Sequence, residues 1–171
     1  FLPTGKLLEY LSNFCKNKNI SLKILGRGRT SKDWKNEREF IDSYVNCTYE
    51  YFPKLKKYSS YEEAIKSKLI VSISSTLAYE MMGLGKRVVN IHTRKSIYPD
   101  IEDTFLWPNF LQREGTFWTE NFNKDKVLDL LEFAYFSDDD KWSYNTSKYY
   151  NNTMTYNKNN TKLYKLLSGE F

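Results

Sequence analysis

A short segment near the middle of the chain constrains the fold more than any other part of the sequence. Leu69, Ile70, Val71 and Ile73 form a nearly continuous apolar run, as in a parallel strand buried on both faces. Residues 87–91, with the sequence Arg-Val-Val-Asn-Ile, predict the next strand. Between the two strands, a Ser-Ser-Thr turn at 74–76 leads into a short helix over 77–82, and two closely spaced glycines follow. This order of strand, turn, helix and strand predicts one βαβ unit.

Helices and strands also alternate ahead of this unit. Apolar residues at helical spacing predict helices over 5–17 and 32–44. Alternating or β-branched residues predict strands over 20–25 and 46–52. The Ser-Tyr-Glu-Glu run at 60–63 fits a capping box that opens a further short helix.

We therefore expect an α/β fold, with a Rossmann-like parallel sheet and helices on both of its faces. The sheet should contain the strands near 20–25, 68–73 and 87–91. An Asn-rich run later in the chain divides it into a Rossmann-like domain over 1–145 and a C-terminal extension over 146–171, which ends in a short helix.

Composition excludes several classes of function. The net charge is +5, but the lysines are scattered singly, which is typical of a solvated surface and predicts no nucleic-acid partner. No apolar run is long enough to predict a membrane span. Cys15 and Cys47 are the only cysteines and His92 is the only histidine, so we expect no metal site. Few cysteines favour a reducing compartment, and Cys15 should be buried packing.

Polar residues follow the 68–73 strand, at the edge where open parallel sheets bind ligands. The helix after Ser74, Ser75 and Thr76 offers unpaired N–H groups and a positive dipole end, so the three hydroxyls could complete a phosphate cradle. Glu80 lies about one turn beyond Thr76, where a carboxylate could accept from ribose hydroxyls. The alternative is that these hydroxyls only cap the helix.

A second polar turn, Gly26-Arg27-Gly28-Arg29, follows the 20–25 strand. Its glycines permit close approach of the backbone, and arginine can bind a phosphate with two hydrogen bonds. The alternative is a solvated basic turn. The pattern is not a dinucleotide fingerprint, because no G-x-G-x-x-G is present.

Three residues are candidates for lining a cleft: Arg29 of this turn, His92 and Glu114. His92 directly follows the 87–91 strand, and Glu114 opens the run Glu-Gly-Thr-Phe-Trp, which could line a sugar site. The competing interpretation of this run is that Phe117 and Trp118 belong to the core, as large aromatic side chains mostly do.

The segment from Val71 to Val88 resembles the donor-site segment of glycosyltransferase-B enzymes, and most closely of bacterial surface-carbohydrate and capsule biosynthesis transferases. The shared features are a buried strand, a Ser-Ser/Thr turn, a Glu in the following helix and then Gly-Lys-x-Val. Further similar elements are Leu25-Gly26-Arg27 with Glu37 and Phe40 downstream, Glu114 to Thr119, and the Trp142 segment.

The resemblance implies a C-terminal domain that binds a nucleotide-sugar donor, with Arg27 and the Ser74–Thr76 turn on its phosphate and Glu80 on its ribose. It implies transfer to a growing surface polysaccharide or lipid-linked glycan acceptor, without a metal cofactor. The N-terminal acceptor domain, which usually carries the catalytic base, would be absent from this chain, so residues 1–171 alone should transfer nothing.

The resemblance also implies a cytoplasmic enzyme, either free or peripheral at the inner membrane face. The donor class stays open, because His92 is followed by Thr93 and not by the proline of cytidine-monophosphate-sugar transferases. Two alternatives remain. One is a sugar-nucleotide 2-epimerase, and the other is a non-catalytic nucleotide- or sugar-binding module.

Overall fold

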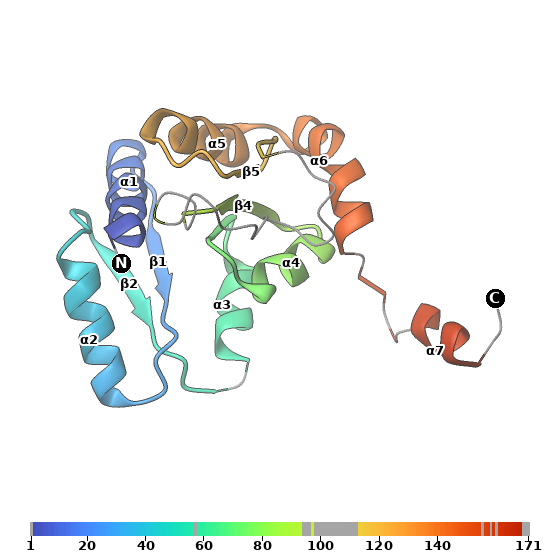
Figure 1. Ribbon diagram of the computed structural model, residues 1–171, viewed down its shortest axis with the longest axis horizontal. Helices are drawn as coiled ribbons and strands as arrows, with labels where there is room; N and C mark the ends of the chain where they lie inside the picture. The colour runs from blue at the N-terminus through green and yellow to red at the C-terminus, as the bar shows by residue number, and fades with distance from the viewer. Residues whose placement is uncertain are drawn as a thin grey trace.

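A computed structural model describes residues 2–56, 58–93, 97, 113–154, 156–157, 159 and 161–168. Helices and strands alternate through most of this part of the chain (Figure 1). In chain order, the elements are α1 (Leu2–Lys18), β1 (Leu22–Leu25), α2 (Ser31–Asp42), β2 (Tyr49–Phe52), α3 (Ser59–Lys66), β3 (Leu69–Ser72), α4 (Thr76–Gly83), β4 (Arg87–Ile91), β5 (Trp118–Thr119), α5 (Lys124–Phe136), α6 (Asp139–Thr153) and α7 (Thr161–Ser168).

The predicted βαβ unit is present. β3 and β4 pair in parallel, with Val71 opposite Val89, and α4 connects them. β5 extends the same sheet on the other side of β4, again in parallel, so the strand order is β3-β4-β5. β1 and β2 form a second parallel pair around α2. These parallel strands and the helices between them confirm the predicted α/β, Rossmann-like class.

The prediction that the 20–25 strand shares a sheet with the other two strands is wrong. Within the described residues, β1 pairs with β2 and no ladder joins it to β3. The two sheets still share one core, because Leu22 and Leu25 of β1 pack against the cluster that contains Val88 and Val89. An apolar pattern reports burial and not which strand edges meet, so it could not separate two short parallel ladders.

Helices cover both faces of the β3-β4-β5 sheet, as predicted. Figure 1 shows β4 between α5 on one side and α4 on the other, and both helices contact it. Three β4 side chains, Val88, Val89 and Ile91, are completely buried as a result. Burial on both faces accounts for these apolar residues, and the polar Asn90 between them is buried as well.

α6 is anchored to the start of β4 and runs unbroken through residues 145 and 146. The hydroxyl of Tyr150 donates to the carbonyl of Lys86 at 3.2 Å and accepts from the N–H of Val88 at 3.3 Å. Tyr150 and Trp142 both belong to the buried core. The division at 145/146 stays a prediction, but the core already includes part of the predicted extension.

The predicted capping box at 60–63 is wrong. α3 begins two residues earlier than this box predicts, at Ser59, and the residue at its N-cap, Tyr58, makes no side-chain cap hydrogen bond. A capping box does occur at α2, where Thr30 and Asp33 exchange hydrogen bonds. Ser-x-x-Glu patterns are frequent, and only the backbone around them decides which becomes a helix start.

Among the helices of the described residues, none combines the length and the apolar character needed to cross a membrane.

Candidate functional site

The turn after β3 leaves the start of α4 without a side-chain cap. Ser75 occupies the N-cap position in an extended conformation, yet its side chain makes no cap hydrogen bond. Its own N–H donates to the hydroxyl of Ser72, the last residue of β3, at 3.1 Å, and this bond fixes the turn to the strand. Ser74, Ser75 and Thr76 are all exposed. The first turn of α4 therefore faces solvent with its positive dipole end and N–H groups that no side-chain cap satisfies.

Three other helices of the same chain begin with a side chain that accepts a hydrogen bond from an N–H group of the first turn. The side chains of Thr30, Asn123 and Asp138 cap α2, α5 and α6. Each accepts a hydrogen bond from the N–H three residues further on, at 3.2, 2.9 and 2.7 Å respectively. Serine caps helices as readily as these residues do. The missing cap at Ser75 therefore argues against the interpretation that this turn exists only to cap its helix.

Glu80 lies on the exposed side of α4, one turn beyond Thr76. The hydroxyl of Tyr61 in α3 donates a hydrogen bond to its carboxylate, and this bond is the main reason why the pKa of Tyr61 is raised. A carboxylate accepts several hydrogen bonds, so Glu80 keeps the capacity to accept from a ligand.

The contact between Tyr61 and Glu80 also relates the two sheets. α3 starts a few residues beyond the carboxyl end of β2, and α4 starts a few residues beyond that of β3. Tyr61 lies in the first turn of α3 and Glu80 near the middle of α4, and the two side chains contact each other. The contact therefore joins the helix that follows β2 to the helix that follows β3.

The turn after β1 is closed by a carboxylate of its own chain. Glu37 of α2 accepts hydrogen bonds from the N–H of Arg27, at 3.1 and 3.2 Å to its two oxygens, and from the N–H of Gly28 at 2.9 Å. The hydroxyl of Tyr51 in β2 donates to the same carboxylate at 2.5 Å. Gly26 is required here, because a Cβ at this position would collide with the Tyr51 ring and hydroxyl.

The next two N–H groups of this turn are satisfied in the same way. Arg29 and Thr30 donate to one oxygen of Asp33, at 3.1 and 3.0 Å. Hydrogen bonds from Thr30 and Arg29 lower the pKa of Asp33. Four consecutive N–H groups, from Arg27 to Thr30, thus point at carboxylates of α2. The side chains of Arg27 and Arg29 are exposed, and no ion pair is recorded for either among the described residues.

His92 and Glu114 meet around β5. The N–H of His92 donates to the carbonyl of Thr119 at 2.9 Å, and Glu114 forms an isolated antiparallel bridge with Thr119. His92 is only 3% exposed. Glu114 pairs with Lys126 at 2.9 Å, and this hydrogen-bonded partner lowers the pKa of Glu114. Their role in lining a cleft stays a prediction, since the chain between them lies mostly outside the described residues.

The aromatic pair of the same run belongs to the core. Phe117 and Trp118 are buried, with ring centroids 4.8 Å apart in an edge-to-face arrangement. Cys15 is buried as well, and burial raises the pKa of its thiol to about 11, which leaves it unreactive at neutral pH. Both packing interpretations are confirmed.

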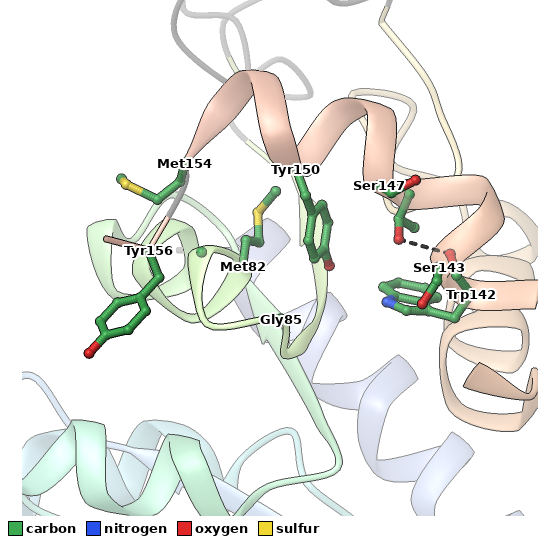
Figure 2. Close-up of a pocket in the computed structure, with 10 residues that line it drawn as sticks. Met82, Gly85, Trp142, Ser143, Ser147, Tyr150, Met154 and Tyr156 are labelled. Atoms are coloured by element: carbon green, nitrogen blue, oxygen red, sulfur yellow. Dashed lines mark hydrogen bonds between the residues drawn. The ribbon is translucent and has the colours of Figure 1, made fainter. Parts of the chain in front are cut away.

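A pocket of about 260 Å³ opens elsewhere, between the end of α4 and α6 (Figure 2). None of the predicted donor-binding residues lines it. Its lining residues are Met82, Gly83, Gly85, Trp142, Ser143, Thr146, Ser147, Tyr150, Met154 and Tyr156. Gly83 and Gly85 precede β4, so the pocket lies at the amino edge of the sheet, opposite the edge at which parallel sheets bind ligands.

The structure thus places some of the predicted residues together, separates others, and brings further residues into the two turns. Ser74, Ser75, Thr76 and Glu80 share one helix start, whereas Gly26 and Arg27 belong to a separate turn of the other sheet. No role was predicted from the sequence for Glu37, Tyr51, Asp33 or Tyr61. The Thr-x-x-Asp spacing at 30–33 is the one local signal that could have revealed part of this arrangement. Within the described residues, no three His, Cys, Asp or Glu side chains gather as metal ligands would.

The described chain is a parallel α/β domain with polar turns at the carboxyl ends of its strands. Residues 1–170 match a protein family described as "putative O-antigen biosynthesis protein", and the chain belongs to this family. The family places the protein in surface polysaccharide biosynthesis. No curated protein and no solved structure matches the chain.

Proposed function

We propose that this chain is the donor-binding domain of a glycosyltransferase of the B type. It would bind a nucleotide-activated sugar for transfer to a surface polysaccharide or lipid-linked glycan. The proposal joins three observations: a parallel α/β fold, an O-antigen biosynthesis family, and a polar helix start at the carboxyl edge of the sheet.

The uncapped start of α4 is the observation that carries the proposal. A nucleotide phosphate placed there accepts from the first N–H groups of the helix, those of Thr76 and Leu77, and from the hydroxyls of Ser75 and Thr76. The helix dipole favours its negative charge. Glu80, one turn along, then accepts from a ribose hydroxyl. This arrangement holds the charge of the donor without a metal ion.

The catalytic step needs groups that the proposal assigns to a second, acceptor-binding domain. In this arrangement the chain supplies binding and orientation of the donor, while the partner domain supplies the acceptor and the base. The protein would then act at the cytoplasmic side of the membrane, where nucleotide-sugars are made.

Titration with a panel of ligands tests the proposal. The chain should bind uridine diphosphate or cytidine monophosphate more tightly than it binds the corresponding nucleosides, and addition of an acceptor should yield no transfer product. A chain that binds the free sugar but no nucleotide would be a sugar-binding module instead. Conversion of a nucleotide-sugar into its 2-epimer would identify an epimerase.

A further inference from the structure

The Gly26–Arg29 turn already contains the anions that its backbone can bind. Successive N–H groups that point to the same side form a concave binding site for anions. In this turn those groups hold the carboxylates of Glu37 and Asp33, at 2.9 to 3.2 Å. An external phosphate therefore finds no free N–H group among them.

The arginine side chains of this turn, unlike its backbone N–H groups, are available to an external anion. Arg27 and Arg29 are exposed, and no carboxylate of the described residues is recorded in an ion pair with either. A guanidinium binds a phosphate with two parallel hydrogen bonds. An anion that approaches this turn can thus contact it through the guanidinium groups only.

Glu37 is itself held in place on two sides. Tyr51 donates to it from β2 at 2.5 Å, and burial, together with the bond to Glu37 and its charge, raises the pKa of Tyr51 well above its ordinary value. Gly26 lets Tyr51 and Glu37 approach the end of β1 closely. A strand, a helix and the turn are therefore fixed to one another through a single carboxylate.

We propose that Glu37 is a positioning residue for Arg27. Its carboxylate fixes the backbone of the Gly26–Arg29 turn, so that a donor phosphate is met by the Arg27 guanidinium and not by the N–H groups of the turn. This inference rests on the proposed function. A backbone that is fixed beforehand loses less freedom when its side chain binds, which increases affinity.

A double-mutant cycle tests this role. Glu37→Gln should lower the affinity for uridine diphosphate by about 5-fold, the loss of one modest interaction, and leave the affinity for uridine unchanged. In the Arg27→Ala background the same substitution should have no further effect, because the group that it positions is gone. Calorimetric titration of the four proteins measures all of these affinities.

Two outcomes of this cycle would overturn the proposal. A higher affinity in Glu37→Gln would mean that Glu37 competes with the phosphate for the N–H groups of the turn. An equal loss in both backgrounds would mean that Glu37 acts on the fold in general and not through Arg27.

Hydrogen exchange separates this inference from the proposed function. Glu37→Gln and Tyr51→Phe should each speed amide exchange at residues 27 and 28, while Glu39→Gln on the exposed side of α2 should not. Unchanged exchange overturns the positioning role even if the parent protein binds nucleotide. If amide exchange is faster in the two variants but the parent protein binds no nucleotide, the proposed function is overturned instead. The role of Arg27 in binding is then overturned with it.

Discussion

The turns after β1 and β3 look alike in the sequence but differ in what occupies them. Both are polar, both follow an apolar strand, and both lead into a helix. The turn after β1 is closed, because carboxylates of the chain accept its N–H groups from Arg27 to Thr30. The turn after β3 is open, because α4 begins without a side-chain cap.

The difference shows that a glycine- and arginine-rich turn is not by itself a phosphate loop. The glycines of Gly26-Arg27-Gly28-Arg29 serve close approach by groups of the same chain, namely Tyr51 and Asp33. In the open turn no glycine is needed, since the helix itself presents the N–H groups. The closed turn should therefore matter chiefly for stability and orientation, and the open turn chiefly for binding.

The largest effect should come from the closed turn. Glu37→Ala should lower the free energy of unfolding by about 2 kcal/mol, because two N–H groups and the Tyr51 hydroxyl lose a charged acceptor. Glu39→Ala, which removes an exposed carboxylate from the same helix, should cost less than about 0.5 kcal/mol. If urea denaturation gave equal losses for the two variants, the hydrogen bonds of the closed turn would contribute no more to stability than an exposed carboxylate does.

A smaller effect is expected at Glu80. Glu80→Gln should weaken binding of a ribonucleotide by about 1 kcal/mol, roughly 5-fold, and barely change binding of inorganic phosphate. Glu62→Gln, an exposed carboxylate of α3, serves as the control and should change neither. If Glu80→Gln weakened both ligands equally, its carboxylate would not be assigned to the ribose.

Stability measurements alone can also distinguish the start of α4 from a capped helix start. Asn123→Ala removes the cap of α5, which should cost about 1 kcal/mol. Ser75→Ala removes no cap hydrogen bond and should cost clearly less. Thermal unfolding that gives the two variants the same loss would mean that Ser75 caps α4 in solution, and the open turn would then be closed as well.

The smallest effect concerns alkaline pH. The raised pKa of Tyr51 means that the unfolded chain releases this proton first, near the ordinary value of 10.0. The stabilisation is therefore complete below about pH 10 and is lost as the pH rises further. Between pH 9 and 11 the parent should lose stability more steeply than Tyr51→Phe does. Parallel curves in denaturant titrations would argue against a Tyr51–Glu37 bond.

Much of the fold could be predicted from the sequence, because burial leaves a periodic trace. The apolar residues of β3 and β4 predicted both strands, and the Ser-Ser-Thr turn between β3 and α4 lies where it was expected. The separation of β1 from β3 could not be predicted in this way, because backbone hydrogen bonds between strand edges determine which strands pair. The capping box at 60–63 failed because its spacing also fits residues inside a helix.

Only part of the candidate site could be predicted from the sequence, for a related reason. Ser74, Ser75, Thr76 and Glu80 lie within one local stretch, so the spacing alone relates them to a helix start. Glu37 reaches the Arg27 turn from ten residues away, and Tyr51 reaches Glu37 from a different strand. Such contacts depend on how elements pack, and no local pattern records them.

Ligand titration of a variant in the open turn tests the claim that nucleotide phosphate binds at the start of α4. Ser75→Ala combined with Thr76→Ala should weaken binding of uridine diphosphate or cytidine monophosphate by about 1–3 kcal/mol, roughly 5- to 150-fold. The folded state should survive, since even a lost cap costs only about 1 kcal/mol. Calorimetry that finds both nucleotides bound as tightly by the double variant as by the parent would contradict the claim.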